Sequence, residues 1–208
     1  MIIAIDGPAA AGKGTLAERV AAYYRLPYLD TGLLYRLVGK LLVERGIDPD
    51  DAAAAGAIAA KVDAAELKDP HLRGHEAGEL ASRVGVHPQV RNALLAFQRD
   101  FARRPGGAVL DGRDIGTVVC PDAEVKIFVT ASLEVRSRRR VKELRDKGET
   151  VIEARVFADM AARDARDSGR DAAPLKPADD AFVLDTSDLD AESALAAAKA
   201  FIESKQKS

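Results

Sequence analysis

The chain has 208 residues, of which 47% are hydrophobic and 31% are charged, and its formal net charge is −2. This balance predicts a sizeable core and argues against a dedicated nucleic-acid or membrane-surface binder, which normally carries net positive charge. The single cysteine, Cys120, excludes an internal disulfide and a cysteine-rich zinc site. No apolar run reaches the roughly 20 residues that span a bilayer, and no signal segment opens the chain. We therefore expect a soluble cytoplasmic protein. We also expect it to be a monomer.

The first motif along the chain is a glycine-rich loop between a strand and a helix. Residues 2–5 are apolar and β-branched, as in a strand buried on both faces, and Leu16, Val20 and Tyr23 recur at helical spacing. This order is that of a P-loop, whose backbone N–H groups and helix N-terminus hold phosphate oxygens. The loop residues expected to bind ATP are Gly7, Pro8, Ala9, Ala10, Ala11, Gly12, Lys13, Gly14 and Thr15.

Two side chains of the loop carry the expected chemistry. Lys13 supplies a compact positive charge for the β- and γ-phosphates. Gly14 takes the usual Ser/Thr position, so the hydroxyl comes one residue later, at Thr15. The alternative is a plain glycine turn with a surface lysine, and the agreement of loop, lysine, hydroxyl and flanking elements argues against it.

The remainder of the chain alternates short apolar strands with helices. We expect further strands at residues 27–29, 108–111, 125–130 and 181–185. We expect helices at residues 33–46, 50–66, 88–101, 132–146 and 150–167 and at the C-terminus, with a loop at 69–74. The pattern predicts an α/β fold with an open, doubly wound parallel sheet of about five strands, in a single domain.

Polar residues follow the predicted strands, where such a fold binds its ligands. Asp30-Thr31-Gly32 follows the second strand, and Asp111-Gly112-Arg113-Asp114 follows the third. A carboxylate at a strand end, such as Asp111, commonly holds Mg²⁺ or its waters beside a P-loop. We therefore expect Mg²⁺, bound with the nucleotide, to lie near Thr15 and Asp111, and we assign no direct ligand.

Basic residues are concentrated in one stretch. Residues 134–170 contain eleven Lys or Arg and eight Asp or Glu, although the whole chain is slightly negative. Each arginine alone could belong to a solvated helix face with i,i+4 ion pairs. As a group they suit an enzyme that moves phosphate between two nucleotides, because guanidinium groups neutralise phosphates and the transferring group. A mobile segment that bears them could also close and exclude water.

Five motifs together resemble the bacterial cytidylate kinases, which are nucleoside monophosphate kinases. They are Gly12-Lys13-Gly14-Thr15, Leu29-Asp30-Thr31-Gly32 with Tyr35-Arg36, Ala81-Ser82 with Val90-Arg91, the block Asp-Gly-Arg-Asp-Ile-Gly-Thr-Val-Val at 111–119, and Arg163-Asp164-x-Arg166-Asp167-x-x-Arg170. The resemblance covers nearly the whole chain. It implies one kinase domain over residues 1–208, with a short acceptor-side insertion at about 50–90 and an arginine-rich lid at about 136–170.

The resemblance implies that ATP and Mg²⁺ are used to phosphorylate CMP, and also dCMP. By the same matching, Ser82 and Asp114 would accept from the cytosine N4 amino group, and Arg91 would donate to N3 and O2. The other implied substrate contacts are Thr31, Tyr35, Arg36, Arg113, Arg163, Asp167 and Arg170. The implied catalytic residues are Lys13, Asp111, Arg113, Arg139 and Arg163.

Several alternatives remain at this point. Thr31 could simply cap the helix that follows it, and Arg113 with Asp114 could be a structural ion pair. The enzyme could be a P-loop kinase for AMP, UMP, dTMP or shikimate. A non-catalytic nucleotide switch is the more distant alternative, and the arginine-rich motifs argue against it because a switch needs no grip on an acceptor phosphate.

Overall fold

The computed structural model describes residues 1–206 and divides into two compact units, which are treated separately below. The first unit comprises Met1–Leu29 and Phe101–Ser208, and the second comprises Asp30–Asp100. Among residues 1–206 there is no helix with the length and apolar character that crossing a membrane requires. The expectation of a single kinase domain stays a prediction.

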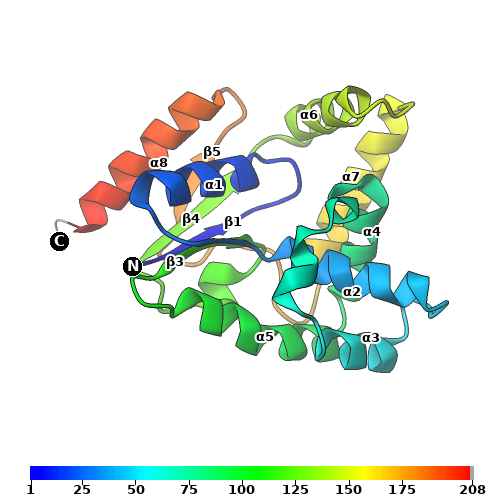
Figure 1. Ribbon diagram of the computed structural model, residues 1–208. Helices are drawn as coiled ribbons and strands as arrows, with labels where there is room; N and C mark the ends of the chain where they lie inside the picture. Colours follow the sequence, from blue (N-terminus) through cyan, green and yellow to red (C-terminus); the bar gives the residue numbers. More distant parts are fainter. Residues whose placement is uncertain (207–208) are drawn as a thin grey trace. The chain divides into compact units, whose positions relative to one another are not determined.

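Five strands and eight α-helices make up the regular structure of the described residues (Figure 1). The strands are β1 (Ile2–Asp6), β2 (Tyr28–Asp30), β3 (Ala108–Gly112), β4 (Val125–Thr130) and β5 (Phe182–Asp185). The helices are α1 (Lys13–Tyr24), α2 (Gly32–Glu44), α3 (Ala52–Ala59), α4 (His75–Val84), α5 (Pro88–Ala102), α6 (Leu133–Asp146), α7 (Glu153–Ser168) and α8 (Ala191–Gln206). Two 3₁₀ helices, η1 (Ala64–Lys68) and η2 (Pro70–Arg73), and one π-helix, η3 (Ile115–Val119), complete them.

The strands form one sheet in the order β2-β3-β1-β4-β5. β1 pairs in parallel with β3 and β4, and β4 pairs in parallel with β5. From β1 the chain passes first to β2 at one edge and later to β4 and β5 on the other side. The strand order therefore reverses beside β1, which is where open α/β sheets bind ligands. The predicted α/β class with five parallel strands is confirmed.

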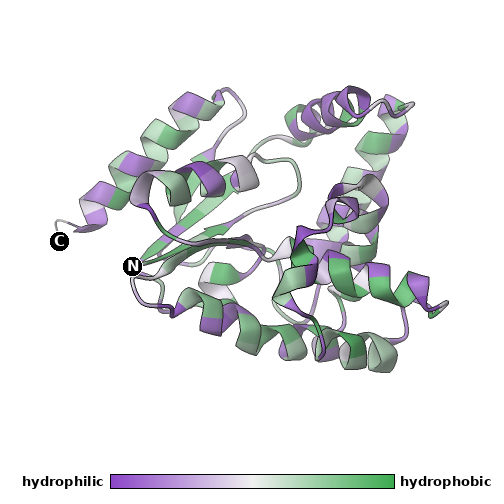
Figure 2. Cartoon of the chain, viewed as in Figure 1, coloured by the Kyte–Doolittle hydropathy of each residue, from purple (hydrophilic) through white to green (hydrophobic). Residues whose placement is uncertain are grey.

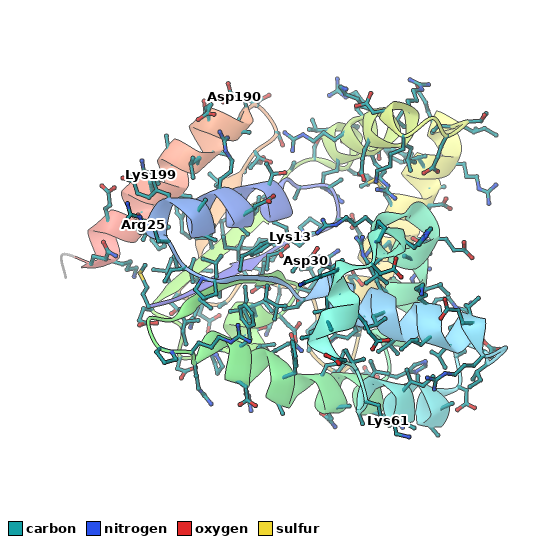
Figure 3. The ribbon with its side chains drawn as sticks, in the orientation of Figure 1. Lys13, Arg25, Asp30, Lys61, Asp190 and Lys199 are labelled. Atoms are coloured by element: carbon teal, nitrogen blue, oxygen red, sulfur yellow. The ribbon has the colours of Figure 1, made fainter. Side chains whose placement is uncertain are left out.

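The core of the first unit lies between the sheet and two helices. Figure 1 shows α1 and α8 side by side over the sheet, and Figure 2 shows the strands as mostly hydrophobic. Leu16 and Val20 of α1 and Ile202 of α8 are buried in one cluster with Ile5 and Ile127. At the outer end, the Lys199 ammonium lies 3.6 Å from the centroid of the Tyr23 ring (Lys199 is labelled in Figure 3). This packing fixes α1, and with it the P-loop, against β1 and β4.

The second unit is helical and depends on close packing of α2 against its neighbours. A Cβ added at Gly39 of α2 would lie 2.6 Å from the Leu80 Cβ of α4, so this contact requires a glycine. Leu33 and Leu37 of α2 are buried with Leu72 of η2. A loop was expected at residues 69–74, but most of this segment forms the 3₁₀ helix η2. Its buried leucine, Leu72, completes this small core.

The alanine-rich stretch at 50–66 differs most from expectation. A single helix was predicted there, but α3 ends at Ala59 and η1 begins at Ala64. Asp63 starts the new element, because its side chain accepts from Ala65 N while the Glu66 side chain accepts from Asp63 N. This capping box satisfies backbone N–H groups at the start of η1, so the chain begins a new element there.

Candidate functional site

The P-loop is shaped by two glycines. Gly7 has φ +153°, and a Cβ there would lie 2.0 Å from the Val129 carbonyl oxygen of β4. The start of the loop can therefore pack this closely against β4 only if the residue is glycine. Gly12 has φ +89° and is the N-cap of α1; it provides no side-chain cap, and the first turn holds no acidic residue. The N-terminus of α1 thus offers its backbone N–H groups and positive dipole end to an anion.

Lys13 and Asp111 meet beside this loop. The Lys13 Nζ lies 3.5 Å from Asp111 Oδ2, and Tyr28 Oη donates to Asp111 Oδ1 at 2.9 Å. The Asp111 side chain is only 2% exposed, whereas Thr15 is exposed at the start of α1. Figure 3 labels Lys13 at this end of α1. The structure therefore brings together the lysine and the strand-end carboxylate that the sequence singled out.

The described residues contain no group of three or more His, Cys, Asp or Glu side chains that would enclose a metal ion. Mg²⁺ in phosphoryl-transfer sites commonly uses one or two protein oxygens and takes its other ligands from water and substrate phosphates. The buried carboxylate of Asp111, beside Lys13 at the P-loop, fits that mode of binding, and the exposed hydroxyl of Thr15 stays a predicted second oxygen.

A second charged group, here termed the arginine cluster, consists of Arg113, Arg163, Asp167 and Arg170. Arg113 Nε donates to Asp167 Oδ2 at 3.0 Å, and Arg163 Nε lies 3.9 Å from the same oxygen. Burial alone would raise the pKa of Asp167, but the attraction of all three arginines outweighs it and holds that pKa below its usual value. Three guanidinium groups around one carboxylate leave net positive charge, which suits a phosphate.

Two arginines of α6 contact the P-loop or a residue that binds it. Arg136 is 6% exposed; it donates to both Asp164 oxygens, to Ala131 O and, at 3.4 Å, to Ala9 O of the loop. Arg139 donates to the side chain and the backbone oxygen of Thr186. The predicted catalytic role of Arg139 is untested by these contacts and stays a prediction. Sequence analysis did not identify Arg136 or Thr186 as site residues.

A buried carboxylate that the sequence analysis passed over lies at the end of β1. Asp6 is 5% exposed and accepts from Ile115 N at 2.7 Å and from Gly116 N at 2.8 Å. Burial raises the pKa of Asp6 to about 7, although both backbone N–H groups act to lower it. Asp114, directly before this turn, is itself buried and raises that pKa further. The available signal was an acidic residue that ends an apolar strand.

The predicted acceptor residues of the second unit lie on α2, α4 and α5. Thr31 is the N-cap residue of α2, but its side chain makes no capping hydrogen bond, so the simple capping interpretation is wrong. The Arg91 guanidinium lies 5.6 Å from the centroid of the Tyr35 ring and donates to Gly85 O. Arg36 donates to Leu72 O at 2.9 Å.

The three residues assigned to the cytosine belong to different units. Ser82 and Arg91 are in the second unit, where Ser82 is 5% exposed, and Asp114 is in the first. Their joint contact with a base stays a prediction. The Arg113 side chain pairs with Asp167 in the arginine cluster.

Comparison with known proteins places the chain in a family. A family model described as "Cytidylate kinase" matches residues 3–204. The chain is 61% identical over 202 residues to a cytidylate kinase of Rhodospirillum rubrum, covering 95% of each chain, and 59% identical over 208 residues to one of Paramagnetospirillum magneticum, covering 99% of each. An uncharacterized protein from Eubacterium ventriosum has a similar fold, with a TM-score of 0.55 at 16% identity over 100% of this chain and 99% of that one. The chain belongs to the cytidylate kinase family.

Proposed function

We propose that the protein uses ATP and Mg²⁺ to phosphorylate CMP, and also dCMP. One observation carries the proposal: a single compact unit holds two separate places that suit phosphates, the P-loop with Lys13 and the arginine cluster. Transfer between two nucleotides requires one place for the donor phosphates and another for the acceptor phosphate, whereas a nucleotide switch requires only the first. The relatives that are named cytidylate kinases support the choice of acceptor.

The proposed mechanism is direct in-line transfer without a covalent enzyme intermediate. Lys13 and the loop amides hold the ATP phosphates, and the arginine cluster neutralises and orients the acceptor phosphate. Asp111 and Thr15 are the residues proposed to hold Mg²⁺ through its waters, and a bound Mg²⁺ would supply positive charge for the triphosphate. The side chains of Arg163 and Arg113 are 17% and 16% exposed, so water screens their charges little.

Recognition of the base is proposed from hydrogen-bond chemistry. Asp114 and Ser82 would accept from the cytosine N4 amino group, and Arg91 would donate to N3 and O2. Uracil carries a carbonyl in place of the amine, so it would leave a buried Asp114 opposite an acceptor. In the second unit, Thr31 and Tyr35 are further proposed contacts of the acceptor nucleotide, and Arg36 is a proposed contact of its phosphate.

The test is an ADP-release assay with ATP and a panel of acceptors: CMP, dCMP, UMP, AMP, dTMP and shikimate. The proposal predicts that CMP gives the highest kcat/KM, and stronger turnover with any of the last four acceptors would overturn it. Arg91→Ala should raise the KM for CMP much more than the KM for ATP. Arg83→Ala is the matched control, since Arg83 pairs with Asp48 and Asp50 at the surface of the same unit.

A further inference from the structure

We propose that Asp6 is a positioning residue for acceptor specificity: it holds the turn that presents Asp114 to the base of the acceptor nucleotide. The inference rests on the proposed function, because it assumes that Asp114 reads the base. Asp6 lies at the end of β1, directly before the P-loop, and nothing in the phosphate chemistry of that loop uses its side chain.

The contact between Asp6 and the turn is two-pronged. One carboxylate oxygen accepts from Ile115 N at 2.7 Å, and the other accepts from Gly116 N at 2.8 Å. These are the two peptide N–H groups directly after Asp114 in the chain. Two short bonds from one rigid carboxylate fix both the position and the orientation of the peptides that follow Asp114.

The turn needs such support because its own backbone is irregular. Asp114 has φ −147° and ψ 25°, outside the regular helical and strand regions, and it leads into the π-helix η3. β3 ends at Gly112, so Asp114 is already beyond the last residue that pairs with β1. Asp6 therefore replaces the sheet hydrogen bonds at the point where the ladder stops.

Gly116 fits closely against this carboxylate. A Cβ added there would lie 3.4 Å from Asp6 Oδ2 and 3.3 Å from two carbons of the Lys126 side chain. The turn thus packs directly against the Asp6 carboxylate. Because both Asp6 oxygens already accept from peptide N–H groups and the side chain is 5% exposed, Asp6 acts through the turn and not on the substrate.

Asp6→Asn is the first test. The amide keeps one acceptor oxygen and turns an N–H donor toward the other peptide N–H, so one bond is lost and two donors face each other. We expect the KM for CMP to rise roughly tenfold to a hundredfold and the KM for ATP to change little, with the kcat/KM ratio of CMP over UMP falling by a similar factor. A merely structural role would lower the active fraction, and therefore kcat, without moving either KM or this ratio.

Two further variants complete the design. Asp190→Asn is the matched control, because Asp190 also accepts a peptide N–H in the same unit, from Ser193, at the start of α8. Gly116→Ala disturbs the contact from the other side and tests the proposal if Asp6→Asn does not fold; it should give the same pattern in milder form.

The outcomes separate this inference from the proposed function. If the unaltered enzyme does not phosphorylate CMP, the proposed function fails. If it does, and Asp6→Asn or Gly116→Ala keeps the original KM for CMP and the original CMP over UMP ratio, the positioning role of Asp6 is overturned. Equal changes in both KM values would also overturn it.

Discussion

Replacement of Arg136 by methionine should destabilise the protein far more than replacement of a surface arginine on the same helix. The Arg136 side chain is 7% exposed and Asp164 is 25% exposed, and their closest approach is 2.6 Å. Removing one partner of a buried pair costs about 3–5 kcal/mol, since the other charge stays behind unpaired. Partial exposure of Asp164 places the expected loss near the lower end, at about 3 kcal/mol, and methionine keeps the volume of the stem.

The measurement is urea unfolding followed by circular dichroism, with Arg136→Met, Asp164→Asn and the double variant as a cycle. A loss of about 3 kcal/mol corresponds to a fall in Tm of roughly 10 °C for a chain of this size. Arg145→Met is the control, because Arg145 pairs with Glu153 at the surface, where both side chains are more than half exposed. If Arg136→Met lost less than about 1 kcal/mol, as the Arg145→Met control is expected to, the argument that Arg136 is a structural tie would fail.

Three further predictions concern Lys13, Asp167 and Asp6. Lys13→Ala should lower kcat by at least about a hundredfold with an unchanged far-ultraviolet spectrum, and near-normal turnover would show that the loop is misassigned. Because the pKa of Asp167 is depressed, its ionised form stabilises the fold above about pH 4, and this contribution is lost as the pH falls further. The Asp167→Asn variant should therefore lose less free energy of unfolding than the unaltered protein when the pH is lowered below about 4. The same pH dependence in both proteins would contradict this prediction. Asp6 has the opposite sign: because burial raises its pKa to about 7, keeping its carboxylate ionised costs the folded state free energy, and the free energy of unfolding should fall by roughly 4 kcal/mol between about pH 4 and pH 7. Asp6→Asn should remove this decline, which urea titrations from pH 4 to 8 would measure.

The elements that could be predicted from sequence are those in which periodicity and local chemistry agree. The apolar run of β1 and the glycines of the loop gave the correct strand, turn and helix in order, because burial and positive φ leave few other residues possible. Helix α6 begins just after Ser132, as expected, since the Ser132 side chain accepts from Val135 N. Helix α7 begins at Glu153, later than the predicted start at 150, and its N-cap, Ile152, provides no side-chain cap.

Contacts between segments far apart in sequence were harder to predict. The pairing of Arg113 with Asp167 spans 54 residues, and the contact of Asp6 with the η3 turn spans about twice that separation. Spacing within one segment carries no information on such partners. The arginine cluster could be anticipated only through a resemblance to a family, and no periodicity in residues 115–119 predicted the π-helix η3.

Hydrogen bonds to the carbonyl oxygens of the P-loop explain the direction in which its N–H groups point. In a trans peptide the C=O and the following N–H point in opposite directions. Arg136 donates to the Ala9 carbonyl, and Thr186 donates to the Ala11 carbonyl at 2.9 Å, so both oxygens face the side of α6 and β5. The N–H groups of the same peptides, those of Ala10 and Gly12, must then face away from that side. A loop held by its carbonyl oxygens is in this way organised for an anion before any nucleotide binds.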